Sequence, residues 1–301
     1  MFDVLVCDMS FTPFINYITL EKRFSPHTQH AYRADLKSFA AFCKSNYDLT
    51  DLSQVHYPMI RDWIVYLSKE GRKNQTINRK CSVLKTYFGF LQKVGQIKHS
   101  PMQFHRQLKA TPKLVVPLTE TEFRAVFDMY DDKDYTGARD ALMLELLYTT
   151  GIRRAELLSL NLDAYDSISA QWRVVGKRNK MRLIPLLPKV VKRIDAYLTF
   201  RNAEANASST NLLFFNTKGK ALNPSYVYKC VTSYLSKVST KQKVSPHVLR
   251  HTFATHLLNR GADINSIKEI LGHKSLSSTQ IYAKVQLPKM KQDYITAHPR
   301  A

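Results

Sequence analysis

The chain has 301 residues, 44% of them apolar and 11% aromatic, a composition that fits a folded protein and excludes a disordered one. Forty-five Lys and Arg against 24 Asp and Glu give a formal net charge of +21, which is typical of proteins that bind DNA, RNA or an anionic membrane. The sequence has no run of about twenty apolar residues, which argues against a membrane span. Four dispersed cysteines without a CxxC pair indicate reduced thiols, so we expect a cytoplasmic protein.

The first third of the chain, residues 11–95, is predicted to be helical. In SPHTQHAYRADLKSFAAFCK, Ser25 is expected to cap a helix whose first turn contains Pro26. PMIRDWIVYLSKEG predicts a second helix that ends at Gly71. NQTINRKCSVLKTYFGFLQKVG predicts a third, with one apolar face formed by Ile77, Cys81, Leu84, Phe88 and Leu91.

Residues 96–117 carry three prolines and no clear period, which predicts a linker. We place this linker at residues 108–116, between an N-terminal domain of residues 1–107 and a second domain of residues 117–301.

The second domain is expected to be mixed. Thr119 and Glu122 have capping-box spacing at the start of a helix, and GARDALMLELLYTTGIRRAELLSL predicts two helices separated at TTG. WRVVGKRNKMRLIPLL has the pattern of a β-hairpin. SPHVLRHTFATHLLNRG, ADINSIKEILG and SSTQIYAKV predict further helices. The expected fold is therefore mainly α, with a small β-sheet in the second domain.

Positive charge is concentrated in residues 170–250, where 16 Lys and Arg face only Asp195 and Glu204. This stretch ends at HVLRHTFATHLL, in which His247, Arg250 and His251 occupy the first turn of a predicted helix. A helix N-terminus already presents unpaired N–H groups and a partial positive charge. The added cations predict an anion site, and phosphate is its natural occupant.

Four other segments contain matching polar groups. Arg153 follows a glycine break and could pair with Glu156 three residues later. Lys177 is expected at the tip of the hairpin. His273 follows a helix-ending glycine, and Tyr282 comes nine residues after it. Each residue alone is common in proteins, so the weight of the pattern lies in the combination.

In their order and spacing these segments resemble the tyrosine site-specific recombinases, the phage integrase family, and within it the Xer-type recombinases. The matching stretches are TGIRRAEL, GKRNKMRLIPL, HVLRHTFATHLL, LGHKSLSSTQIY and the terminal HPRA. SPHTQHAYRADLKSF is similar to the family's N-terminal DNA-binding domain, so the resemblance covers nearly the whole chain.

The resemblance implies six catalytic residues: Arg153, Lys177, His247, Arg250, His273 and Tyr282. Tyr282 would attack a DNA phosphodiester and form a 3′-phosphotyrosyl link. The two arginines would clamp the non-bridging oxygens, and His273 would hydrogen-bond the same phosphate. His247 would assist proton transfer at the tyrosine, and Lys177 would protonate the departing 5′-oxygen. Arg154 and His251 are expected to have structural or supporting roles.

The resemblance also implies a helical N-terminal core-binding domain that grips the duplex together with the catalytic domain, and it implies no cofactor and no metal. The expected partner is double-stranded DNA with a specific recombination site, on which four identical or mixed protomers assemble, with a possible second recombinase. Residues 284–301 would then dock on a neighbouring protomer through Met290 and Tyr294, or else fold back onto their own domain. Further DNA contacts are expected from Arg33, Arg79, Lys80, Arg178 and Lys180.

The residues agree with such chemistry. Phosphoryl transfer needs fixed positive charge, from metal ions or from side chains. Acidic residues are too sparse between 167 and 301 for a convincing two-metal cluster. The sequence has no GxxxxGK[ST] loop, and a covalent tyrosyl intermediate would conserve the energy of the broken bond.

Several alternatives remain open. SIKEILGHKSLSSTQIY has the outline of a helix-turn-helix, as in a non-catalytic DNA-binding regulator. His247 and His251 lie four residues apart, as in some zinc enzymes, although the HExxH glutamate is missing. A type IB topoisomerase would share the tyrosyl mechanism. Within the recombinases, we favour Xer-like chromosome-dimer resolution over the integrase or invertase of a mobile element.

Overall fold

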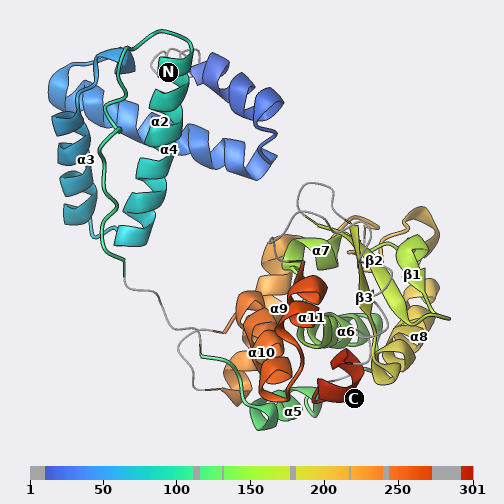
Figure 1. Ribbon diagram of the computed structural model, residues 1–301. Coiled ribbons are helices and arrows are strands. Elements are labelled where there is room, and N and C mark those ends of the chain that lie inside the picture. Colours follow the sequence, from blue (N-terminus) through green and yellow to red (C-terminus); the bar gives the residue numbers. More distant parts are fainter. Residues whose placement is uncertain are drawn as a thin grey trace. The chain divides into compact units, whose positions relative to one another are not determined.

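The computed structural model describes residues 11–110, 116–130, 132–176, 181–216, 218–239, 244–272 and 293–300. The chain divides into two compact units, Met1–Lys113 and Leu114–Ala301, here called the N-terminal and C-terminal units (Figure 1). No helix within the described ranges is both long and apolar enough to cross a membrane. Cys43, Cys81 and Cys230 are free thiols and are buried.

The N-terminal unit is helical throughout its regular structure. Residues 11–16 form a helix that continues into a π-helical turn, Tyr17–Glu21. The main helices are α2 (Pro26–Tyr47), α3 (Tyr57–Lys69) and α4 (Asn74–Lys93), with a 3₁₀ turn at Leu52–Gln54. The predicted cap is confirmed, since the Ser25 hydroxyl accepts a hydrogen bond from the Thr28 amide at 3.3 Å. The whole predicted apolar face of α4 is buried.

The C-terminal unit combines helices with one small sheet. Its helices are α5 (Glu120–Phe127), α6 (Tyr135–Thr150), α7 (Arg154–Leu158), α8 (Pro188–Ala203), α9 (Pro224–Val238), α10 (Pro246–Asn259) and α11 (Ile264–Leu271). Short 3₁₀ turns cover Leu162–Ala164 and Ala207–Ser209, and residues 293–297 are helical. The predicted capping box is confirmed, because the Thr119 hydroxyl accepts from the Glu122 amide and the Glu122 carboxylate accepts from the Thr119 amide.

The sheet is antiparallel, in the order β1 (Tyr165–Asp166), β2 (Gln171–Val175) and β3 (Met181–Pro185). β2 and β3 form the predicted hairpin, with Trp172 opposite Ile184 and Val174 opposite Arg182 on the buried face. In Figure 1 the sheet lies at the edge of the C-terminal unit, and α6 runs through the centre of that unit. α6 packs against α8 and α10, and α11 packs against β3. The prediction of a mainly helical protein with a small sheet is confirmed.

Candidate active site

The turn between α6 and α7, which leads to Arg153, is formed around a glycine. Gly151 has a left-handed backbone, with φ of +59°, and ends α6. A Cβ atom there would lie 2.5 Å from Cδ1 of Phe253 and 2.7 Å from Cδ2 of Leu271. The position therefore requires glycine both for its backbone conformation and for its close packing. The tight turn that results delivers Arg153 to the start of α7.

Arg153 is held by the ion pair that its spacing predicts. Its backbone amide donates to Oε2 of Glu156 at 2.9 Å, and its Nη1 donates to Oε1 at 2.8 Å. Its Nη2 reaches the carbonyl oxygen of Gly272 at 3.2 Å. The side chain is still 31% exposed, so part of the guanidinium remains accessible.

Arg250 comes from α10 and approaches the same place. Its guanidinium donates to the carbonyl oxygens of Gly151 and Leu271. Burial, together with the neighbouring positive charges of Arg153 and Arg182, lowers the pKa of Arg250 to about 10. The group stays charged at neutral pH, and an anion beside it would relieve the repulsion.

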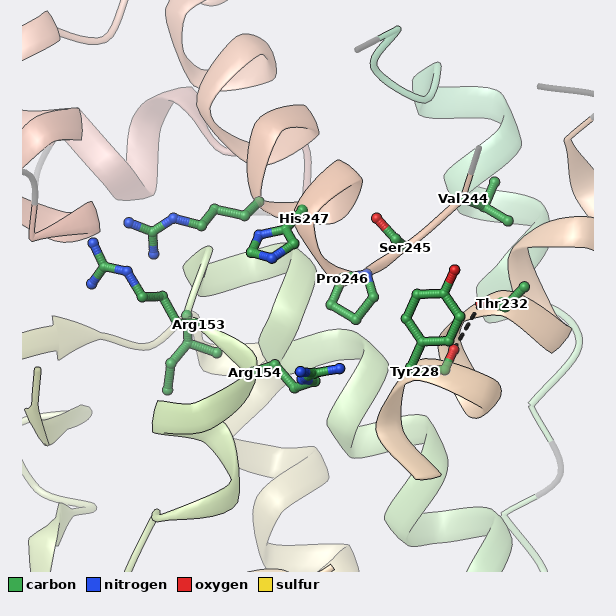
Figure 2. A pocket seen from close by; sticks show the side chains of 10 residues that line it. Arg153, Arg154, Tyr228, Thr232, Val244, Ser245, Pro246 and His247 are labelled. Atoms are coloured by element: carbon green, nitrogen blue, oxygen red, sulfur yellow. Dashed lines mark hydrogen bonds between the residues drawn. The ribbon is translucent and has the colours of Figure 1, made fainter. Parts of the chain in front are cut away.

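A pocket of about 320 Å³ opens beside these arginines, between α7, α9 and α10. Arg153 and His247 lie at one end of it, and Tyr228 and Thr232 of α9 lie at the other (Figure 2). Its full lining is Ile152, Arg153, Arg154, Tyr228, Thr232, Val244, Ser245, Pro246, His247 and Arg250. The pocket thus joins a cationic end to an aromatic and hydroxyl-bearing end.

The fold brings together three of the six predicted catalytic residues, Arg153, His247 and Arg250. The other three, Lys177, His273 and Tyr282, lie outside the described residues, as do Arg178 and Lys180. His251 is exposed on α10, so it does not pack in the core. Arg154 has a structural contact, since its Nη1 reaches the carbonyl oxygen of Pro224 at 3.4 Å, although it also lines the pocket.

A third arginine beside the site was not singled out from the sequence. Arg182 of β3 donates from both terminal nitrogens to Glu156, at 2.9 and 2.8 Å. Burial alone would raise the pKa of Glu156, but hydrogen bonds from Arg182 and Arg153 outweigh it and lower the pKa to about 2. An arginine on the buried face of a strand is the sequence signal that could have revealed it.

The expected DNA-contacting residues of the N-terminal unit have different surroundings. Arg79 and Lys80 on α4 both bind the buried carboxylate of Asp35, with Lys80 Nζ at 2.8 Å from Oδ1. The Arg79 side chain is 51% exposed, whereas Lys80 is 13% exposed and lies over the ring of Trp63. Arg33 lies on α2.

The last described residues, 293–300, pack within the C-terminal unit. Tyr294 is buried and its hydroxyl donates to the carbonyl oxygen of Thr149 at 2.9 Å. Arg300 pairs with the buried carboxylate of Glu145 and lies over the ring of Phe127. Burial lowers the pKa of His298 to about 3. In this structure Tyr294 therefore lies in its own unit, the second of the two expected arrangements, and Met290 is outside the described residues.

Comparison with known proteins gives consistent matches along the chain. The model of the phage integrase family matches residues 116–287, and that of the phage integrase N-terminal SAM-like domain matches residues 11–95. Tyrosine recombinase XerC of Pelotomaculum thermopropionicum is 35% identical over 297 residues, covering 96% of this chain and 97% of that protein. Tyrosine recombinase XerD of Staphylococcus epidermidis is 32% identical over 289 residues, covering 96% and 98%.

A solved structure shares the fold. The XerH site-specific recombinase, bound to a palindromic difH substrate in a post-cleavage complex, aligns with a TM-score of 0.69 at 23% identity. The alignment covers 88% of this chain and 78% of that one.

Proposed function

The chain belongs to the phage integrase family as a site-specific tyrosine recombinase of the Xer type, and on this premise we propose that the pocket between α7, α9 and α10 holds the scissile phosphate of its DNA substrate. One observation carries the proposal: Arg153 and Arg250, from different helices, reach one pocket that His247 also lines. Guanidinium forks match the non-bridging oxygens of a phosphate.

The charge balance supports a phosphate at this place. Arg153, Arg182 and Arg250 are neighbours, and among the described residues the carboxylate of Glu156 forms ion pairs with Arg153 and Arg182. The cluster therefore keeps an excess of positive charge. The charge that develops on the equatorial oxygens during phosphoryl transfer would be stabilised by this excess without any rearrangement.

The reaction assigned to the site is a transesterification. The phenolic oxygen of Tyr282 attacks the phosphorus, its proton leaves with help from His247, and a 3′-phosphotyrosyl bond forms. The bond between phosphorus and the 5′-oxygen breaks, and Lys177 supplies a proton to that oxygen. His273 hydrogen-bonds the phosphate. Reversal with the 5′-hydroxyl of another strand rejoins the DNA, so the number of bonds is conserved and no external energy source is needed.

The biological role we propose is chromosome-dimer resolution in the cytoplasm, supported by the similarity to XerC and XerD along almost the whole chain. The partner would be duplex DNA with a specific site, bound by four protomers of one or two kinds. A domain of residues 1–107 and a catalytic domain of residues 117–301, joined by a linker of residues 108–116, would grip the duplex. Residues 284–301 would be able to pass to a neighbouring protomer.

Additional contacts to the phosphates are proposed for Arg33, Arg79, Lys80, Arg178 and Lys180. Of the two residues on α4, Arg79 is the better candidate for a phosphate contact, because half of its side chain is exposed while that of Lys80 is mostly buried. Replacing a cation that contacts a phosphate would weaken binding to DNA of every sequence to a similar degree. It would also reduce the dependence of the binding affinity on salt concentration.

Covalent trapping tests the proposed function. The substrate is a duplex chosen because the protein binds it specifically, with a nick close to the cleavage point. The short fragment that carries the new 5′-hydroxyl then diffuses away, and the protein–DNA adduct accumulates. We expect a protein–DNA adduct that resists detergent, is removed by protease and is absent with Tyr282→Phe. Chelation of metal ions should leave it in place. Adduct formation by Tyr282→Phe together with its loss in Tyr228→Phe would move the nucleophile to Tyr228, which lines the pocket.

A further inference from the structure

Arg182 lies close to the site but outside its pocket. It lies on the buried face of β3, paired with Val174 of β2, and its side chain is 11% exposed. Its Nη1 and Nη2 bind the two oxygens of Glu156, and its Nε donates to the carbonyl oxygen of Ile270 at 2.9 Å. The pocket lining does not include it. Arg182 therefore uses its hydrogen-bonding groups on the protein.

The C-terminal end of α11 connects Arg182 to the two arginines of the pocket. Three successive carbonyl oxygens at this helix end each accept from a different guanidinium. Ile270 accepts from Arg182, Leu271 accepts from Arg250, and Gly272 accepts from Arg153. The last carbonyls of a helix have no partner within it and carry a partial negative charge, so one helix end fixes three cations from three other elements.

The packing leaves little freedom at this junction. Gly272 is left-handed, with φ of +63°, and a Cβ atom there would lie 3.1 Å from Cδ of Arg182 and 3.3 Å from its Nε. The Arg182 side chain thus lies directly against the turn that ends α11. Glu156, the second partner of Arg182, also holds the amide and the guanidinium of Arg153.

We infer that Arg182 is a positioning residue that sets the relative placement of Arg153 and Arg250 around the scissile phosphate, without touching the DNA. It holds Arg153 through Glu156, and it holds the end of α11 against which Arg250 and Arg153 are fixed. Lysine cannot replace it, because a single ammonium cannot bind both oxygens of Glu156 and the Ile270 carbonyl in the same planar geometry. The inference rests on the proposed function of the pocket.

The test uses the charge of the substrate. In a methylphosphonate, a methyl group replaces one non-bridging oxygen, so the reacting group is neutral and gains less from well-placed arginines. Single-turnover cleavage is measured for wild type and variants on matched phosphate and methylphosphonate duplexes. For Arg182→Gln we expect the cleavage rate on the phosphate substrate to fall by roughly 100-fold. On the methylphosphonate substrate the fall in rate should be at least tenfold smaller. Arg153→Gln should show the same pattern.

Arg201→Gln is the matched control. Arg201 is also a buried arginine of the C-terminal unit, and it donates to the carbonyl oxygens of Thr210 and Leu212, away from the pocket. Any loss that it causes should be equal on both substrates, as expected of a general effect on folding. Arg182→Lys, which keeps a positive charge, repeats the comparison if Arg182→Gln does not fold, and the same substrate dependence is expected.

The possible results distinguish the positioning role of Arg182 from the phosphate site itself. One result would overturn the positioning role and leave the phosphate site in place. In it, the Arg182 variants lose the same factor in cleavage rate on both substrates, as expected for Arg201→Gln, while Arg153→Gln shows the substrate dependence. If Arg153→Gln itself loses equally on both substrates, the proposed phosphate clamp is wrong, and the role of Arg182 falls with it.

Discussion

Replacing Gly151 by alanine should damage the C-terminal unit more than any ordinary glycine substitution. The residue has φ of +59°, and the added methyl group would lie 2.5 Å from Phe253 and 2.7 Å from Leu271. A non-glycine residue in the left-handed region costs about 1–2 kcal/mol. Moving two packed core side chains adds about 1–3 kcal/mol. We therefore expect Gly151→Ala to lower the free energy of unfolding by about 2–5 kcal/mol.

The matched control is Gly261→Ala in the same unit. Gly261 has φ of +83°, but a Cβ atom there would meet nothing within 4 Å, so only the backbone cost of about 1–2 kcal/mol applies. Urea unfolding at neutral pH measures both variants. Losses that agree within about 0.5 kcal/mol would show that the contacts with Phe253 and Leu271 do not add to the cost. Because the Gly151 carbonyl accepts a hydrogen bond from Arg250, DNA cleavage should also fall in Gly151→Ala and not in Gly261→Ala.

Three further predictions concern stability. The folded-state pKa of Glu156, about 2, lies below its ordinary 4.5, so its stabilisation is present above pH 4.5 and is lost as the pH falls toward 2. Glu156→Gln should thus cost about 3 kcal/mol at pH 7, and urea unfolding between pH 7 and 3 should show this difference shrinking; a constant difference contradicts the linkage. Thr119→Ala removes the capping box and should cost about 1 kcal/mol in the same assay, against which an unchanged stability would count. Tyr294→Phe removes a buried hydrogen bond to Thr149 and should cost about 1 kcal/mol at every protein concentration; a loss seen only at high concentration would mean that the segment docks on a neighbouring protomer.

Local signals made much of the fold predictable. Ser25 and Thr119 are helix caps that act within three residues along the chain, and both form as expected. The apolar face of α4 follows from the helical period alone. The Arg153–Glu156 pair is also a contact within one helical turn. These features depend on neighbours in sequence, where spacing fixes geometry.

The long-range contacts of the site could not be read in this way. Arg182 meets Glu156 and Ile270 only because β3 lies beside α7 and α11, and nothing in the sequence around Arg182 encodes those distances. Tyr228 and Thr232 enter the pocket from α9 for the same reason. Tyr294 is apolar enough to be buried in either its own unit or another, so its helical spacing alone left both arrangements open.

The most direct test of the central claim is to identify the amino acid that becomes linked to DNA. The trapped adduct is digested with protease and nuclease, and the nucleotide-bearing peptide is sequenced by mass spectrometry. We expect a peptide with Tyr282 joined to a 3′-phosphate and a free 5′-hydroxyl on the released strand. Attachment at Tyr228 or any other residue, or a link to a 5′-phosphate, would contradict it.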